Sequence, residues 1–184
     1  MTFSRIYESA GVRRLPVDPV EIACALGIKV VSYKAAAEHF DMELSELYSY
    51  SPLGFCFKEG EQYCIALNEN ACGEQRRRFT AAHELAHCLL GHTDSGAVLK
   101  RQERDAERFA AELLAPLVVL HKCGVGSSAE IARLCGISKA AAANRLYELA
   151  ERERLGFEIS DDERHTTELF REFTEGYSAR HRVL

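Results

Sequence analysis

One stretch, Phe79–His92, constrains this chain more than any other. It reads FTAAHELAHCLLGH and contains His83, Glu84 and His87 in the pattern H-E-x-x-H. Helix positions four apart lie about 40° apart around the axis, so both imidazoles can reach one metal ion. Glu84 follows the first histidine, so its carboxylate can reach a water molecule at such an ion without binding the ion. The stretch therefore predicts a metal site on a helix.

The residues around the motif favour a helix over 74–90. Apolar side chains recur there at helical spacing, which predicts a buried stripe with both histidines at its edge. The members of this stripe are Phe79, Ala82, Ala86 and Leu89. A short motif can also arise by chance, as two half-buried histidines beside an unrelated glutamate. The helical context favours the metal site, because it turns both imidazoles the same way.

The third metal ligand is expected from a second helix, over residues 98–115. A catalytic zinc takes three protein ligands and leaves a fourth position for water. Carboxylates occur on this helix at Glu103, Asp105, Glu107 and Glu112. Glu103 and Glu107 flank the apolar face, whereas Asp105 points away from it. The residue pattern therefore leaves both Glu103 and Glu107 as candidates.

Short strands and further helices complete the expected α+β fold. Strands are expected at 28–33, 55–58 and 63–67, the last two paired across a turn at Gly60. Helical patterns occupy 20–26, 34–47, 117–123, 131–135, 139–149 and 161–173. We expect a small sheet packed on the two site helices, followed by a helix-turn-helix-like end.

The segment 131–149, IARLCGISKAAAANRLYEL, resembles a helix-turn-helix unit with Ser127 and Ser138 as helix caps. Residues 127–150 hold three basic and two acidic side chains, a net charge of +1. The second helix is rich in alanine and offers few side chains to base edges. We expect a packing role here and no direct DNA binding.

Net charge, apolar runs and cysteine spacing argue against several classes of protein. The 184 residues carry a net charge of −5, which argues against a basic nucleic-acid-binding surface. The N-terminal segment has no apolar core of a secretory signal, and no run is long enough to cross a membrane. The seven cysteines are scattered without a C-x-x-C pair, which indicates reduced thiols in a cytoplasmic protein and disfavours a cysteine zinc site.

Two strings of the chain, RRRFTAAHELAHCLLGH and ERDAERFAAELLAP, resemble the paired signatures of the ImmA/IrrE family of zinc metallopeptidases. That family has R-F-T-x-A-H-E-x-x-H followed by E-x-x-A-N-x-F-A-x-x-L-L-x-P, and the order, spacing and closing proline agree. The similarity covers about residues 16–155. It implies a zincin-like fold with zinc bound by His83, His87 and Glu103. One departure is Glu107, which stands where the family usually has asparagine and could support or replace Glu103 at the metal.

The expected function is a cytoplasmic zinc endopeptidase. Glu84 would take a proton from water and pass it to the leaving amine. His92, His121 and Tyr147 are candidates by type for stabilising the oxyanion. The resemblance implies a helix-turn-helix transcriptional repressor as substrate, in a stress response or the control of a mobile element. The rival hypothesis is a non-catalytic module that binds DNA or sequesters a repressor, with zinc structural or vestigial.

Three segments are expected along the chain. Residues 1–126 would form the metallopeptidase domain, 127–155 the helix-turn-helix-like segment and 156–184 a polar C-terminal tail.

Overall fold

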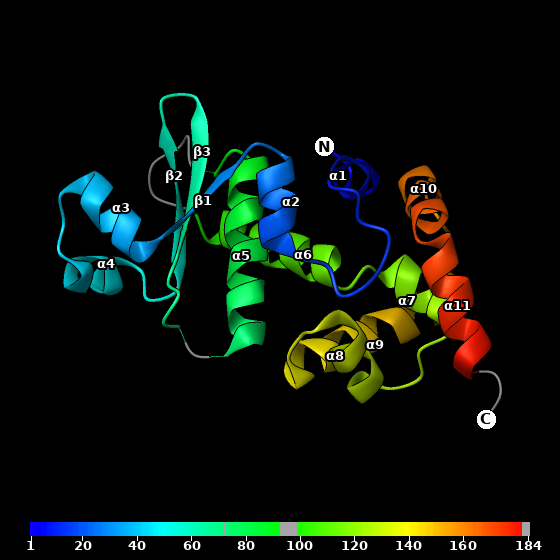
Figure 1. The fold of residues 1–184 in the computed structure, drawn as a ribbon. Coiled ribbons are helices and arrows are strands. Elements are labelled where there is room, and N and C mark those ends of the chain that lie inside the picture. The colour runs from blue at the N-terminus through cyan, green and yellow to red at the C-terminus, as the bar shows by residue number, and fades with distance from the viewer. Residues whose placement is uncertain (72, 93–98, 182–184) are drawn as a thin grey trace. The chain divides into compact units, whose positions relative to one another are not determined.

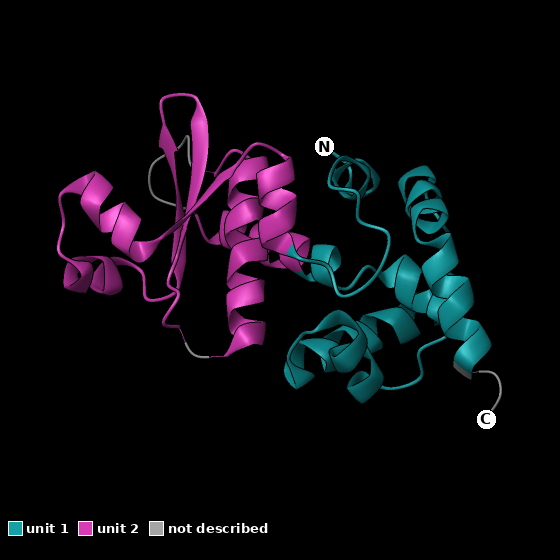
Figure 2. Ribbon diagram, viewed as in Figure 1, with its two compact units in different colours: residues 1–18, 111–184 teal, residues 19–110 magenta. Residues whose placement is uncertain are grey.

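The computed structural model describes residues 1–71, 73–92 and 99–181. The chain divides into two compact units (Figure 2): unit 2 is Pro19–Ala110, and unit 1 combines Met1–Asp18 with Ala111–Leu184. Helices occur in both units and a small sheet in unit 2, which confirms the expected α+β class. The three functional segments expected from the sequence stay a prediction.

Unit 2 is built around a sheet with strand order β1-β3-β2. The strands are β1 (Lys29–Ser32), β2 (Gly54–Glu59) and β3 (Gln62–Leu67). β2 and β3 form the predicted antiparallel hairpin, and Gly60 takes a positive φ of 61° in its turn. β1 runs parallel to β3, with Val30 opposite Ile65, so the chain crosses over between them. β2 is therefore an edge strand.

Helices lie on both faces of this sheet (Figure 1). One face carries α2 (Pro19–Ala25) and α5 (Glu74–Leu89), and the other carries α3 (Tyr33–Phe40) and α4 (Leu44–Tyr50). Because successive side chains along a strand point to opposite faces of the sheet, β2 contributes side chains to the helix layers on both faces. Phe55 and Phe57 pack against the core of the α3 side, whereas Cys56 between them reaches Glu84 on α5.

Residues 34–47, expected as one helical segment, form parts of two helices. Asp41 adopts the left-handed conformation, with φ of 52°, and ends α3. Glu43 then begins α4 through a capping box with Glu46. The prediction of a single helical segment was wrong, because hydrophobic spacing does not reveal where a left-handed residue ends one helix and a capping box begins the next.

The helix that carries the H-E-x-x-H motif, α5, lies where the sequence predicted it, and Gly91 with φ of 69° follows its end. Ala82 and Ala86 are fully buried as expected. Phe79 is 36 % exposed, so the predicted stripe is wrong at that position, and Leu85 is buried instead. The stripe was misjudged because the sheet covers a different sector of the helix than spacing alone suggested.

A close approach fixes β2 against α5. A Cβ atom on Gly54 would lie only 2.7 Å from Thr80 Cγ2. Thr80 is itself buried. Glycine at position 54 therefore lets the strand lie tight against the helix that carries the site.

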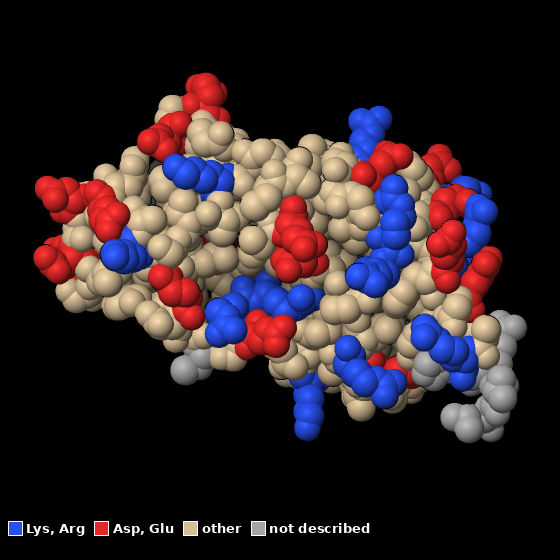
Figure 3. Space-filling model, in the orientation of Figure 1, with Lys and Arg blue, Asp and Glu red and all other residues tan. Residues whose placement is uncertain are grey.

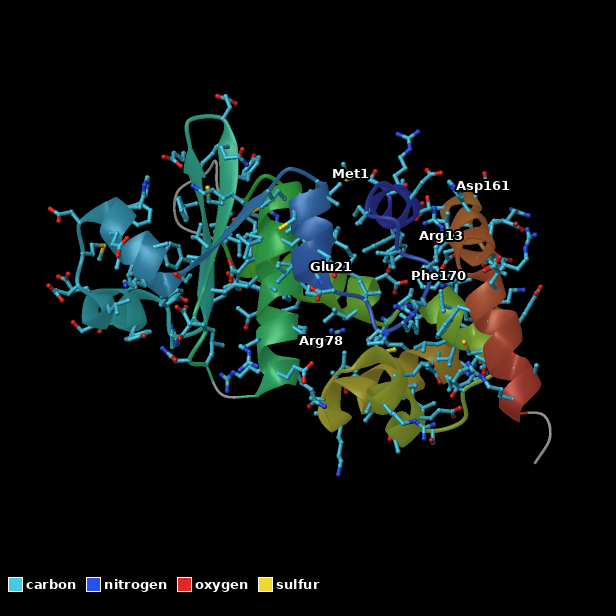
Figure 4. All side chains as sticks on the ribbon, in the orientation of Figure 1. Met1, Arg13, Glu21, Arg78, Asp161 and Phe170 are labelled. Atoms are coloured by element: carbon cyan, nitrogen blue, oxygen red, sulfur yellow. The ribbon has the colours of Figure 1, made fainter. Side chains whose placement is uncertain are left out.

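Unit 1 is helical in its described residues. Beyond the end of α6 (Lys100–Leu114), its helices are α1 (Phe3–Ser9), α7 (Leu117–Cys123), α8 (Ser128–Cys135), α9 (Lys139–Arg154), α10 (Asp161–Leu169) and α11 (Arg171–His181). The segment expected as one helix over 161–173 is thus split between α10 and α11. Both contact α7, and α10 also contacts α1. Phe170, labelled in Figure 4 between α10 and α11, is fully buried and meets Tyr7 edge-on at 5.3 Å.

Candidate metal centre

Three side chains from two helices of unit 2 converge on one point. His83 and His87 come from α5, and Glu103 comes from α6. His83 Nε2 lies 3.0 Å from His87 Nε2 and 3.3 Å from Glu103 Oε2. Glu103 Oε1 lies 3.6 Å from His87 Nε2. Within residues 1–71, 73–92 and 99–181, these three form the one group of histidine, cysteine and carboxylate side chains that could hold a metal ion.

The distances within this group fit a tetrahedral ion. Zinc binds imidazole nitrogen and carboxylate oxygen at about 2.0–2.2 Å, which places neighbouring ligand atoms of a tetrahedron about 3.3 Å apart. The separations of 3.0, 3.3 and 3.6 Å bracket that value. Two imidazoles and one carboxylate are also a donor set of catalytic zinc sites, which leave the fourth position open. The residues present therefore fit zinc.

The structure separates the two glutamates that the sequence left open. Glu103 reaches both histidines, and its side chain is 48 % exposed. Glu107, one turn further along α6, is exposed and lies outside the group of three. Glu112 forms an ion pair with Arg145, whose Nη2 lies 2.5 Å from Glu112 Oε2. The geometry thus favours Glu103, and its role as a ligand stays a prediction.

Glu84 points towards β2 and is held there by Cys56. Burial raises the pKa of Glu84 to about 7, the hydrogen bond from the Cys56 thiol opposes that rise, and the charge of Glu103 adds to it. The backbone amide of Cys56 donates a second hydrogen bond to the same carboxylate. A divalent cation nearby would lower this pKa, because it favours the carboxylate form. Glu84 is therefore a fixed carboxylate beside the group of three.

Sequence reasoning missed Cys56. The available signal was its place between Phe55 and Phe57 in a strand, since the middle residue then faces the opposite layer. Contact with the Cys88 thiol, together with burial, raises the pKa of Cys56 well above its usual range. The thiol therefore stays protonated and can donate to Glu84. The cysteines in the described part of the chain are free thiols, in agreement with the reading of the sequence.

The three oxyanion candidates fall in different places. His92 is buried in unit 2, and its Nδ1 lies 3.0 Å from Nδ1 of His87, on the far side of that ring from the group of three. His121 and Tyr147 belong to unit 1. There His121 Nδ1 lies 2.8 Å from a carboxylate oxygen of Glu153, and Tyr147 is exposed. Of the three candidates, His92 lies beside a histidine of the group of three.

The helix-turn-helix-like segment has the expected caps, because Ser127 and Ser138 accept hydrogen bonds at the starts of α8 and α9. Arg145, one of its three basic residues, is buried and donates from Nε to the Ala115 carbonyl at 3.0 Å. Arg145 thus ties α9 to the chain just after α6. On the face drawn in Figure 3, basic and acidic side chains are interspersed, with acidic ones gathered over α3 and α4. These observations support packing as the role of the segment.

No helix among the described residues combines the length and the apolar character needed to cross a bilayer. Searches of curated proteins and of solved structures found no match to the chain. The model of one protein family, described as the IrrE N-terminal-like domain of peptidase M78, matches residues 25–147. The match exceeds half of the 184 residues, includes both site helices and confirms the resemblance seen in the sequence. The chain therefore belongs to the peptidase M78 family of IrrE N-terminal-like domains, a family of metallopeptidases.

Proposed function

We propose that the chain is a zinc-dependent endopeptidase. The observation that carries this proposal is the convergence of His83, His87 and Glu103 within ligand distance of one another, on two helices that the family model also matches. Glu84 lies beside this group without belonging to it, as a proton acceptor should. Zinc as the metal is supported by the donor set and the separations.

The chain's own residues supply the proton transfers. A zinc ion, when bound, supplies a Lewis acid that lowers the pKa of water and polarises a peptide carbonyl. Glu84 accepts the proton of the attacking water at its carboxylate and later gives it to the leaving amine. The thiol and the backbone amide of Cys56 orient that carboxylate. Because the Glu103 side chain is 48 % exposed, the group of three is open to a substrate.

β2 offers a binding place for a substrate backbone. It is an edge strand, and Cys56 in its middle faces Glu84. An extended peptide can pair with such an edge through main-chain hydrogen bonds. We propose that the substrate adds to β2 as a strand, with its scissile bond close to Glu84.

The substrate that we propose is a regulatory protein, a helix-turn-helix transcriptional repressor, cleaved in the cytoplasm during a stress response or in the control of a mobile element. The support for this substrate is the sequence resemblance stated above. The packing role inferred for α8 and α9 agrees with a protein that acts on a repressor and does not itself bind DNA.

Metal analysis and one substitution test the proposal. The wild-type protein should bind about one zinc per chain, since three ligands fix one ion. Glu84→Gln leaves the ligands intact, so zinc content should not change while cleavage of the repressor falls by about 10²- to 10⁴-fold. Cleavage is followed by electrophoresis and mass spectrometry of the fragments.

Two results would favour the rival functions instead. If Glu84→Gln relieves repression as fully as the wild type, the chain sequesters its partner and is not acting as a peptidase. A gel shift of a specific DNA duplex by this chain alone, weakened by salt, would indicate direct DNA binding.

A further inference from the structure

His92 is a buried polar residue to which the proposed reaction assigns no task. It is 7 % exposed. Gly91, in the left-handed conformation just after the end of α5, turns the chain so that His92 lies beside His87. The two Nδ1 atoms are 3.0 Å apart, and the rings are tilted by 68° with their centroids 5.0 Å apart. The residues therefore meet through their nitrogen atoms and not through stacked ring faces.

A contact between two Nδ1 atoms requires one proton between them, and its position decides what His87 can do. If the proton is on His92, then Nδ1 of His87 is the acceptor, and the other ring nitrogen of His87, Nε2, carries a hydrogen. If the proton is on His87 Nδ1, then Nε2 of His87 has a free lone pair. That lone pair is directed at His83 and Glu103, since Nε2 is the atom that meets both.

His83, the other proposed ligand histidine, has no such contact at its Nδ1 atom within the described part of the chain. His83 Nδ1 is buried and has no hydrogen-bond partner among the residues that the structure describes. His83 is therefore held at Nε2 alone, whereas His87 is held at both nitrogens. Histidines that bind metals usually donate the hydrogen of their other ring nitrogen to a fixed acceptor, which sets the tautomer and the ring orientation.

We infer that His92 is a positioning residue for the metal site: its Nδ1 accepts a hydrogen bond from His87 Nδ1 and so keeps the lone pair of His87 Nε2 directed at the metal. The inference rests on the proposed function, because it concerns the same zinc ion. It gives the H-E-x-x-H helix a third functional histidine, supplied by the turn that follows it.

The test compares three substitutions of His92. All three place a sizeable side chain there, but they differ in whether a hydrogen-bond acceptor lies near the position of His92 Nδ1. His92→Phe keeps a ring of similar shape without any acceptor, and His92→Asn places its amide oxygen near the position of Nδ1. His92→Gln has the same amide group but carries it further out, near the position of Nε2. His39→Phe, in which an exposed histidine away from the group of three is replaced, is the matched control. Zinc dissociation constants are measured by competition with a chromophoric chelator, and metal-free thermal unfolding is followed by circular dichroism.

We expect His92→Phe and His92→Gln to weaken zinc binding by about 10- to 100-fold. His92→Asn and His39→Phe should stay within about threefold of the wild type, because the first keeps the acceptor and the second is remote. Metal-free unfolding should not follow the same order. If His92→Phe does not fold, the comparison of His92→Asn with His92→Gln decides the question.

Equal zinc affinity in the wild type, His92→Phe and His92→Gln would overturn the inference. It would also fail if His92→Asn binds zinc as weakly as His92→Gln does. Both results leave the peptidase proposal standing, because the wild type still binds zinc. A wild-type protein that binds no zinc would instead refute the proposed function.

Discussion

Glu103 on α6 places its carboxylate Oε2 3.3 Å from Nε2 of His83 on α5. The sequence located both helices but did not choose between Glu103 and Glu107. Positions 103 and 107 lie on nearly the same face of α6 but one turn apart, so the choice depends on where α6 lies along its axis relative to α5. In the structure Glu103 is the residue that reaches the two histidines, and Glu107 is exposed.

The two glutamates should therefore differ in metal binding. Glu103→Ala should lose at least about 100-fold in zinc affinity, because the site keeps only two ligands. Glu107→Ala should bind zinc within about threefold of the wild type, since Glu107 lies outside the group. Zinc content after gel filtration and competition with a chelator measure both. Loss of zinc only in Glu107→Ala would overturn the ligand assignment.

Cys56 should matter for the reaction rate and not for metal binding. Cys56→Ala removes the thiol donor to Glu84 and keeps the backbone donor, so kcat should fall by about fivefold, the equivalent of one hydrogen bond of about 1 kcal/mol. Cys56→Ser keeps a donor and should stay within about twofold. Zinc content should be unchanged in both, because Cys56 is not in the metal group. Equal kcat in Cys56→Ala and the wild type would show that the thiol does not orient Glu84.

Gly54 should not tolerate a side chain. Gly54→Ala should lower the free energy of unfolding by about 1–3 kcal/mol, because the new methyl group would lie 2.7 Å from Thr80 Cγ2. Thr80→Ser deletes that Cγ2 atom, so the double variant should recover part of the loss. A double-mutant cycle by urea denaturation measures the coupling between the two positions. Additive effects would mean that the strand adjusts without meeting the threonine.

Unit 1 should lose stability in acid through Glu163. The hydrogen bond from Arg152 is the main reason why the pKa of Glu163 falls from 4.5 to about 2. A carboxylate whose pKa is lowered by folding stabilises the protein fully above its unfolded pKa and loses that effect as the pH falls through its folded pKa. The wild type should therefore exceed Glu163→Gln in stability at pH 6, and this difference should shrink between about pH 4.5 and pH 2.

Urea denaturation at pH 6, 4 and 3 measures this difference. Arg152→Met removes the hydrogen-bond partner of Glu163. Its free energy of unfolding should therefore also be lower than that of the wild type at pH 6, and most of this difference should likewise disappear as the pH falls. A difference between wild type and Glu163→Gln that is constant from pH 6 to pH 3 would contradict the prediction.

Several elements were predictable because their causes are local. The β2–β3 hairpin follows from two short apolar runs around Gly60, and the starts of α8 and α9 follow from Ser127 and Ser138. The segment at 34–47 was mispredicted because Asp41 ends one helix where the spacing alone continued it. Periodicity predicts which residues share a helix face but not which sector of the helix a sheet will cover, so Phe79 is exposed although its spacing predicts burial.

The sequence alone determined that His83 and His87 share one face of a helix and that Glu84 adjoins them. These relations lie within two turns, where the helical period decides which side chains meet. Three contacts were decided only by the tertiary structure. Glu103, and not Glu107, reaches the histidines, Cys56 donates hydrogen bonds to Glu84, and Nδ1 of His92 meets Nδ1 of His87. Those contacts depend on how strands, turns and helices are rotated and packed against one another, and packing is fixed by the whole core and not by spacing along one segment.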